Sequence, residues 1–372
     1  MTSPDRAIQG THAKPLFLIS GDTAPQRREL LSRLQEQLSC SGGPASVLVL
    51  DLAGGPAQPF PESKGPAMRW ESYAPEPWAD QIWEQLLPVL EPWSALLEGS
   101  LNGLERPASR EIPGLESLLG CLYLAHRCAG EAAVETEALI VVLPPLEQAL
   151  PLLQLACRGP DLLEGLWRPL LLWWSQTRQR LAQVELLLRL RLPPAESLVL
   201  SERWRQSLEG LAERLCAPQA AAEVLLALAT EPEDLAGLAG RIVAMPLSGL
   251  PRLRLWLEGD LPMAATTQLE HQLALPMLSG RVALDCGDVD AWLNQPLPPE
   301  TTLWETSENG IHRCRLFLPG LAREGLQVQH QDLNLQIRSS GMRLTVTMPR
   351  DWGQLTCRSA RLEAPWLVID FG

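Results

Sequence analysis

The turn after the first apolar segment holds the residues whose types suit anion chemistry. Gly21 directly follows the apolar run Leu16–Ser20, and Gln26, Arg27 and Arg28 open the helical pattern that comes next. A phosphate site at a helix N-terminus uses glycines so that backbone N–H groups can approach the anion, cationic side chains to neutralise it, and a Ser or Thr hydroxyl for magnesium. Arg27 or Arg28 could contact a phosphate, because a guanidinium matches its oxygens.

Most other requirements of such a site are missing from this turn. Gly21 is its only glycine, Pro25 lacks an N–H group, and Asp22 places negative charge beside the expected anion. The same residues fit a plain helix start, in which Thr23 and Gln26 form a capping box and Pro25 is tolerated in the first turn. We therefore predict no cofactor site here and keep nucleotide binding by the two arginines as an alternative.

The cysteines and histidines suggest neither a metal site nor a nucleophile. None of the eight cysteines forms a CxxC pair, and the five histidines show no HExxH or triad spacing. Cys121 and Cys128 share one face of an expected helix with His126 nearby, but a third ligand is not evident. We interpret both cysteines as small buried apolar residues and predict no metal and no catalytic residue.

Composition excludes several classes of protein. With 372 residues, 46% of them apolar and 20% charged, the chain is large enough for two domains and should fold. Its net charge of −13 disfavours a nucleic-acid surface, which has to be cationic, and Lys14 and Lys64 are the only lysines. Residues 1–14 are polar, so we expect a flexible N-terminus without a secretory signal and a cytoplasmic protein.

Apolar runs alternate with helical patterns over 15–304, which is typical of a mostly parallel α/β sheet. The run Ala138–Leu143 is apolar throughout, as expected of a strand covered on both faces. Pro88 is expected to kink or break the helix predicted over 77–97. The expected strands are Leu16–Ser20, Val47–Leu50, Ala138–Leu143, Glu223–Leu228 and Arg252–Leu257, and the expected helices are Ala24–Leu38, Pro77–Leu97, Leu115–Ala125, Ser201–Leu215 and Pro232–Val243.

A stretch rich in leucine and tryptophan interrupts this alternation and predicts a helical subdomain over about 160–215. Its apolar residues surround the helix on nearly all sides, so something must cover them. The alternatives are ordinary core or a homodimer interface, and a surface for a hydrophobic helix of a protein partner. Prolines and charges interrupt the stretch, so we expect no transmembrane span, while peripheral membrane contact stays open. The candidate residues are Leu163, Leu166, Trp167, Leu170, Trp173 and Trp174.

From about residue 305 the pattern changes to short segments of period two separated by tight turns, which predicts a small antiparallel β-sandwich over 305–372. This tail resembles the α-crystallin-like sandwich of small heat-shock proteins, with Ala364 and Pro365 in place of the usual Asn-Gly turn before the last strand. Such a sandwich implies an interaction domain. The resemblance rests on Leu316, Pro319, Gly320, Val328, Asp332, Leu333, Leu335, Met348, Pro349, Ala360, Leu362, Leu367, Val368 and Ile369.

Ahead of the sandwich, the order of segments resembles the arsenite-pump (ArsA-like) and tail-anchored-protein-targeting ATPases, specifically the subgroup that carries this sandwich at its C-terminus. Leu16–Leu30 matches the phosphate-loop position, Pro113–Leu119 the Pro-Gly stretch, and Ala138–Pro145 the second switch. The resemblance implies a P-loop-NTPase-like sheet with a helical insertion and a homodimer. It also implies a groove for hydrophobic client helices in the leucine- and tryptophan-rich region. The family's paired zinc-binding cysteines are not matched.

The family's catalytic pattern is not matched either. Leu143 followed by Pro144 stands where the family has an Asp that organises magnesium and water, and a leucine cannot coordinate a metal. Glu116 is the one carboxylate retained in the Pro-Gly stretch, where we interpret it as a capping or solvated residue. The resemblance therefore implies a pseudo-ATPase.

Three functional hypotheses follow. The leading one is a non-catalytic, protein-binding or chaperone- and targeting-like module for hydrophobic segments, with no cofactor. The second is a weakly active ATPase that uses Arg27 and Arg28 at the phosphates of Mg-ATP. The third is a structural dimeric scaffold.

Overall fold

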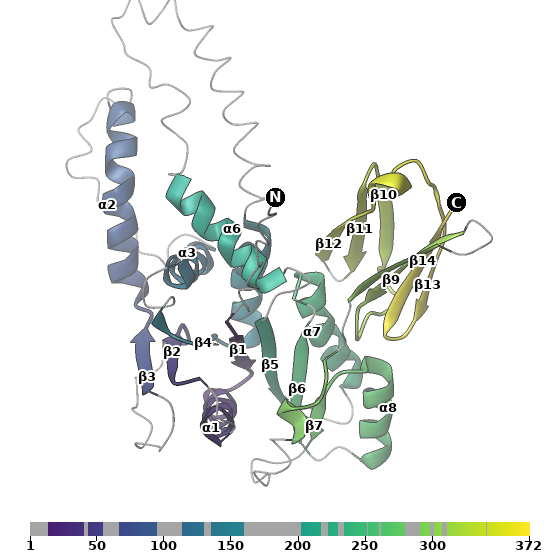
Figure 1. Cartoon of the computed structure of the whole chain (residues 1–372), viewed down its shortest axis with the longest axis horizontal. Helices are drawn as coiled ribbons and strands as arrows, with labels where there is room; N and C mark the ends of the chain where they lie inside the picture. Colours follow the sequence, from purple (N-terminus) through teal and green to yellow (C-terminus); the bar gives the residue numbers. More distant parts are fainter. Residues whose placement is uncertain are drawn as a thin grey trace, which may run out of the picture.

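A computed structural model shows a parallel α/β part followed by two small antiparallel sheets (Figure 1). This arrangement confirms the predicted fold class. The helical insertion expected over about 160–215 is described only from residue 202 onward. The structure describes residues 14–40, 44–54, 67–94, 114–129, 135–159, 202–216, 222–229, 234–250, 252–259, 262–279, 291–297, 301–306, 311–339 and 341–372.

The large sheet has seven parallel strands in the order β3-β2-β4-β1-β5-β6-β7. Strand β1 lies in the middle, with Leu16 beside Leu139 of β4 on one side and Ala222 of β5 on the other. The carboxyl end of β1 therefore opens at the centre of the sheet. The strands are β1 Leu16–Gly21, β2 Ser46–Asp51, β3 Ala67–Ser72, β4 Ala138–Val142, β5 Ala222–Ala229, β6 Leu253–Glu258 and β7 Met277–Ser279.

Helices cover both faces of this sheet (Figure 1). Helix α1 packs on one face, while α3, a helix over 146–159, α6 and α7 pack on the other. The predicted strands and helices that lie in the described residues are confirmed, whereas β3, the helix over 146–159, α8 and β7 were not predicted. The helices are α1 Ala24–Cys40, α2 Pro75–Ser94, α3 Leu115–Ala129, α6 Glu202–Cys216, α7 Leu235–Leu247 and α8 Met263–Leu273.

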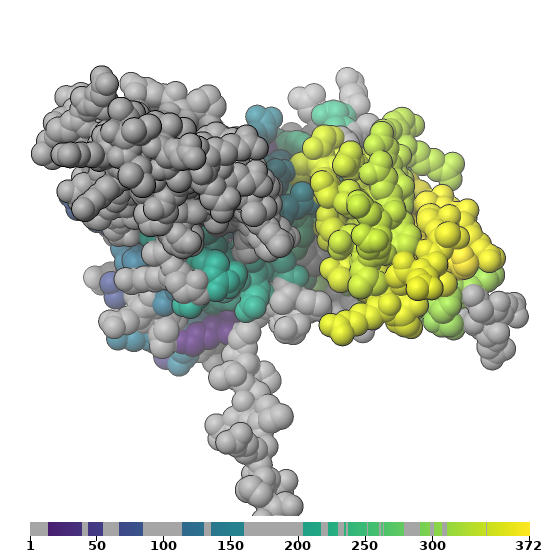
Figure 2. Space-filling model, turned by 90° about the horizontal axis from the view of Figure 1, so that it is seen from above, coloured from purple at the N-terminus to yellow at the C-terminus, as the bar shows by residue number. Residues whose placement is uncertain are grey.

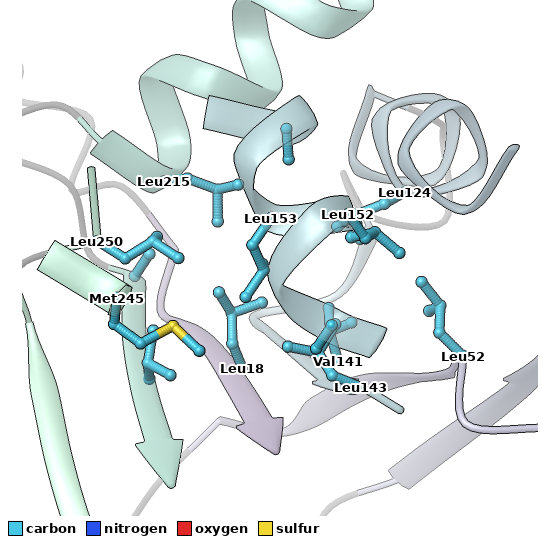
Figure 3. Packing of buried hydrophobic residues seen from close by; sticks show 14 of the residues in the cluster. Leu18, Leu52, Leu124, Val141, Leu143, Leu152, Leu153, Leu215, Met245 and Leu250 are labelled. Atoms are coloured by element: carbon cyan, nitrogen blue, oxygen red, sulfur yellow. The ribbon is translucent and has the colours of Figure 1, made fainter. Parts of the chain in front are cut away.

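The sheet buries alternate residues on opposite sides, as strand geometry requires. Leu18 and Val141 lie in the core under Leu152 and Leu215 of the covering helices (Figure 3), whereas Ile19 packs on the other side, in the cluster that includes residues of α1. Because both faces are covered, the strands are apolar almost throughout, which explains why apolar runs identified them.

Of the kink or break expected at Pro88, the break is wrong, because α2 continues through Pro88 from Pro75 to Ser94. A proline inside a helix removes one backbone hydrogen bond and costs about 3 kcal/mol. Trp78 and Ile82 offset this cost by burying their side chains in the core, and the Trp78 indole N–H donates to the Leu119 carbonyl at 3.0 Å. Tertiary packing thus overrides the local preference. Among the described helices, none is long and apolar enough to cross a bilayer.

The C-terminal part consists of a four-stranded sheet, β13-β14-β9-β8, and a three-stranded sheet, β10-β11-β12. The strands are β8 Thr302–Thr306, β9 His312–Phe317, β10 Gln327–Gln331, β11 Asn334–Ser339, β12 Met342–Thr347, β13 Cys357–Glu363 and β14 Trp366–Phe371. Strand β8 begins at Thr302, ahead of the expected boundary at 305. The short antiparallel strands expected of the tail are present, and β8 was not predicted.

The sandwich packs directly against α7 of its own chain, and Figure 2 shows it (yellow-green) beside the teal α/β part. Val243 and Leu247 of α7 belong to the sandwich's apolar cluster, together with Leu316 and Leu335. At the same contact, Gly320 has φ +82°, and a Cβ there would lie 2.4 Å from the Ala239 carbonyl oxygen. The two parts therefore share an apolar core.

Candidate functional site

The candidate site is the turn between β1 and α1, at the carboxyl edge of the sheet. In open α/β sheets, ligands bind outside the carboxyl ends of the strands, at the point where the strand order reverses. Gly21 ends β1 at the centre of the sheet, and Asp51, Ala229 and Glu258 end β2, β5 and β6 at the same edge. The position is therefore the one at which a ligand would be expected.

The turn begins α1 with the predicted capping box, which is confirmed. The Thr23 backbone N–H donates to Gln26 Oε1 at 2.9 Å, and the Gln26 backbone N–H donates to Thr23 Oγ1 at 3.4 Å. Reciprocal bonds of this kind satisfy backbone donors that a helix start would otherwise leave open. The first turn of α1 accommodates Pro25, as expected.

Removing the Thr23 hydroxyl is the direct test of this cap. Thr23→Ala is expected to lower the free energy of unfolding by about 1 kcal/mol, because the first turn of α1 loses its side-chain acceptor. Urea denaturation measures the change. Thr23→Ser keeps the hydroxyl and is expected to stay within a few tenths of a kcal/mol of the wild type. Equal losses in the two variants would show that the hydroxyl has no capping role.

Arg27 lies inside the turn. Its residue is 6% exposed, and Nη1 donates to the Gly21 carbonyl oxygen at 2.9 Å. Burial lowers the pKa of Arg27, against the opposing effect of the Asp51 and Asp22 charges, while the neighbouring Arg28 lowers it further. Burial likewise raises the pKa of Asp51, although the Ala53 N–H and the Arg27 charge counteract this. Arg27 and Asp51 thus form a partly desolvated charge pair at the end of the sheet.

Further polar contacts tie the turn to its neighbours. The Asp22 carboxylate accepts two bonds from Arg241 Nη1 of α7, each at 3.0 Å, and one from the Ala229 backbone N–H at 2.8 Å. Gln26 donates its side-chain N–H to Glu258 at the end of β6. The side chains of this turn are therefore engaged with the protein itself.

No family model matches the chain, and no curated protein matches it. The chemistry of the turn consequently has to be judged from its own contacts.

The structure brings Gly21, Gln26 and Arg27 together, as the sequence suggested, and places Arg28 on the exposed side of α1. Asp51, Arg241 and Glu258 were not predicted as parts of this site. Their only sequence signal is that Asp51 and Glu258 follow apolar runs, where strands end. The proposed client residues Leu163, Leu166, Trp167, Leu170, Trp173 and Trp174 lie outside the described residues.

The other positions on which the resemblance to the ATPases rests have structural contacts here. Leu143, in the segment that resembles the second switch, is fully buried beneath the helices that cover β4 (Figure 3). The carbonyl of the following Pro144 accepts a bond from Ser20 Oγ at 3.0 Å. Glu116 is exposed in the first turn of α3, where a carboxylate favours the helix N-terminus.

Cys121 and Cys128 are buried in α3, as predicted. Burial raises the pKa of Cys121 to about 12 and that of Cys128 to about 11, so both thiols stay protonated at neutral pH. His126 stacks near Trp78 at a ring distance of 5.3 Å. The described residues contain no group of three or more His, Cys, Asp or Glu side chains that could hold a metal.

Proposed function

We propose that this chain is a pseudo-ATPase: a non-catalytic relative of the arsenite-pump and tail-anchored-protein-targeting ATPases that acts as a protein-binding, chaperone- or targeting-like module for hydrophobic segments. The observation that carries the proposal is the self-contained hydrogen bonding of the turn between β1 and α1. A protein whose turn is occupied by its own hydrogen bonds can still bind other proteins, because the helices that cover the sheet and the sandwich fold without a bound nucleotide.

Several of the backbone donors that a phosphate would use are bonded to the protein itself. The N–H of Asp22 donates to the Ala227 carbonyl at 3.2 Å, that of Thr23 to the Gln26 side chain, and that of Arg27 to the Thr23 carbonyl at 3.3 Å. Pro25 has no N–H to offer. A phosphate would have to displace several bonds at once, and each bond left unmade costs about 1–3 kcal/mol when its group is buried.

The glycine of the turn also has a structural explanation. A Cβ at Gly21 would lie 2.7 Å from the Ala227 carbonyl oxygen of β5, which a side chain cannot do without a backbone shift. Gly21 is therefore required by the close approach of β1 and β5, whether or not an anion binds.

Charge at the turn also supports the proposal. Asp22 is part of the turn, and its carboxylate accepts bonds from Arg241 and the Ala229 backbone N–H. The Glu258 carboxylate accepts a bond from Gln26, and Asp51 interacts electrostatically with Arg27. The guanidinium of Arg27 is committed to the Gly21 carbonyl. These carboxylates place negative charge at the turn, which disfavours a triphosphate there.

Calorimetric titration of the full chain with Mg-ATP tests the catalytic half of the proposal. We expect no saturable heat at micromolar nucleotide and no phosphate release above that of buffer, because the donors of the turn are occupied. The ATPase alternative predicts binding and phosphate release that Arg27→Met/Arg28→Met abolishes. Micromolar binding with turnover in the wild type, lost in this double variant, would overturn the proposal.

Fluorescence of a hydrophobic dye tests the client-binding half. Exposed client-binding apolar surface should raise dye fluorescence in the wild type and lose this effect in Trp173→Glu/Trp174→Glu. Circular dichroism checks that the double variant folds. The scaffold alternative predicts a dimer with no dye binding in either protein, and sedimentation measures the oligomeric state directly.

A further inference from the structure

Beside the contact between the sandwich and α7 lies a cleft of about 810 Å³, bounded by the sandwich, the C-terminal end of α7 and the ends of two neighbouring helices. One wall is the three-stranded sheet, through Arg343, Thr345 and Thr347 of β12 and Gln336 of β11. The opposite wall includes Arg158, at the end of the helix over 146–159. This volume falls within the range of about 300–1,000 Å³ that ligand pockets usually have.

The cleft runs along the open edge of β12. Every residue over 343–347 lines it, although successive side chains of a strand point to opposite faces of the sheet. The cavity therefore reaches both sides of β12 at its outer edge and also covers Asn334 and Gln336 of β11 on one face. Within the described sheet, β12 pairs only with β11.

The hydrogen-bond register shows which backbone groups face this edge. The Met348 N–H donates to the Leu333 carbonyl at 2.7 Å, so these two residues form a hydrogen-bonded pair. Such pairs alternate along antiparallel strands. Continuing the register along β12, Arg343, Thr345 and Thr347 direct their N–H and C=O groups away from β11 and toward the cleft. An edge of this kind is a template for one more strand.

The charge of the cleft contrasts with that of the chain. The chain has 44 acidic residues against 31 basic ones, yet no Asp or Glu is among the described residues that line the cleft. Arg343 is exposed there, and its guanidinium has no hydrogen bond or ion pair among the described residues. Arg158 donates to the Leu247 carbonyl at 2.9 Å and adds a second positive charge. Such a lining favours an anionic partner.

We propose that the cleft binds an extended peptide segment of a partner protein, which adds to β12 as a further strand and places acidic side chains against Arg343 and Arg158. A second copy of β12 fits less well, because its sequence carries another arginine and no carboxylate. The inference deepens the proposed function, on which it rests for the premise that the chain binds proteins. It concerns a different surface from the hydrophobic-segment site.

Fluorescence anisotropy with the full chain and three labelled, acetylated probes tests this inference. The first probe alternates valine with glutamate, the second alternates valine with lysine, and the third is the glutamate probe N-methylated at alternate residues. We expect the glutamate probe to bind and the other two to bind at least about tenfold more weakly. The lysine probe carries the opposite charge, and the N-methylated probe lacks the backbone N–H groups that pair with β12. Absence of binding by the glutamate probe, or equal binding by the N-methylated one, would overturn the inference.

Variants of the chain locate the site. Arg343→Glu is expected to weaken the glutamate probe at least about tenfold and to strengthen the lysine probe. Thr345→Pro removes an outward N–H without removing a bond to β11, so it should block strand addition while the sheet stays paired. Unchanged affinity in Arg343→Glu would contradict the inference even if Thr345→Pro fails to fold. Both the dye response and the Mg-ATP titration are expected to be unaffected by Arg343→Glu, which separates this test from that of the proposed function.

Discussion

Arg254→Met is expected to lower the free energy of unfolding by about 3–5 kcal/mol, the usual cost of removing one partner from a buried ion pair. The Arg254 side chain is 6% exposed, and its Nε donates to Glu223 Oε2 at 2.9 Å. Its Nη1 donates to the carbonyls of Trp292 and Gln295 at 2.8 and 2.9 Å. Methionine fills a similar volume but leaves these acceptors without their donor.

The matched control is Arg252→Met, which removes a second arginine near the same carboxylate. The Arg252 side chain is 35% exposed and lies 3.6 Å from Glu223 Oε1. Since exposed ion pairs contribute about 0–1 kcal/mol, this variant should lose less than about 1 kcal/mol. Urea denaturation of both variants measures the difference. Equal losses would mean that the burial of Arg254 does not decide its contribution.

Gly320→Ala is the second change with a large expected effect, a loss of about 2–5 kcal/mol. About 1–2 kcal/mol comes from a side chain at φ +82°, and about 1–3 kcal/mol from overpacking, because the new Cβ would lie 2.4 Å from the Ala239 carbonyl oxygen. That oxygen belongs to the backbone of α7 and cannot move aside alone. The sandwich therefore has to shift away from α7.

Gly325→Ala isolates the backbone contribution. Gly325 has φ +71°, close to that of Gly320, but a Cβ there meets nothing within 4 Å. Its loss should be only about 1–2 kcal/mol. Chemical denaturation compares the two variants, and limited proteolysis is expected to cleave near the contact faster in Gly320→Ala alone. Identical behaviour of the two variants would show that the contact with α7 contributes nothing.

The sequence predicted those parts of the fold that depend on local pattern. Apolar runs such as Ala138–Val142 identified the central strands, because burial on both faces leaves little room for polar residues. Strand β3, Ala67–Ser72, escaped prediction because it lies at the sheet edge with no fully buried residue, so it lacks an apolar run. The break expected at Pro88 was wrong for a different reason. The cost of a proline inside a helix can be read from the sequence, but the packing of α2 on the core, which outweighs it, cannot.

The candidate site was predicted only where it is local. The capping box of Thr23 and Gln26 spans three residues, so its spacing is visible in the sequence. The bond from Arg241 to Asp22 joins residues more than two hundred positions apart, and no periodicity in the sequence indicates it. The cleft along β12 is likewise a product of how the sandwich docks, which the pattern of its own strands does not contain.

The shared core at α7 determines where the chain can be divided into fragments. Val243 and Leu247 contribute their side chains to the interior of the sandwich although they belong to the preceding helix. A C-terminal fragment that begins at the first sandwich strand would lack these two side chains, which leaves a cavity in its core and exposes the apolar surface around it. A fusion protein that carries the sandwich should therefore include α7 to complete the core.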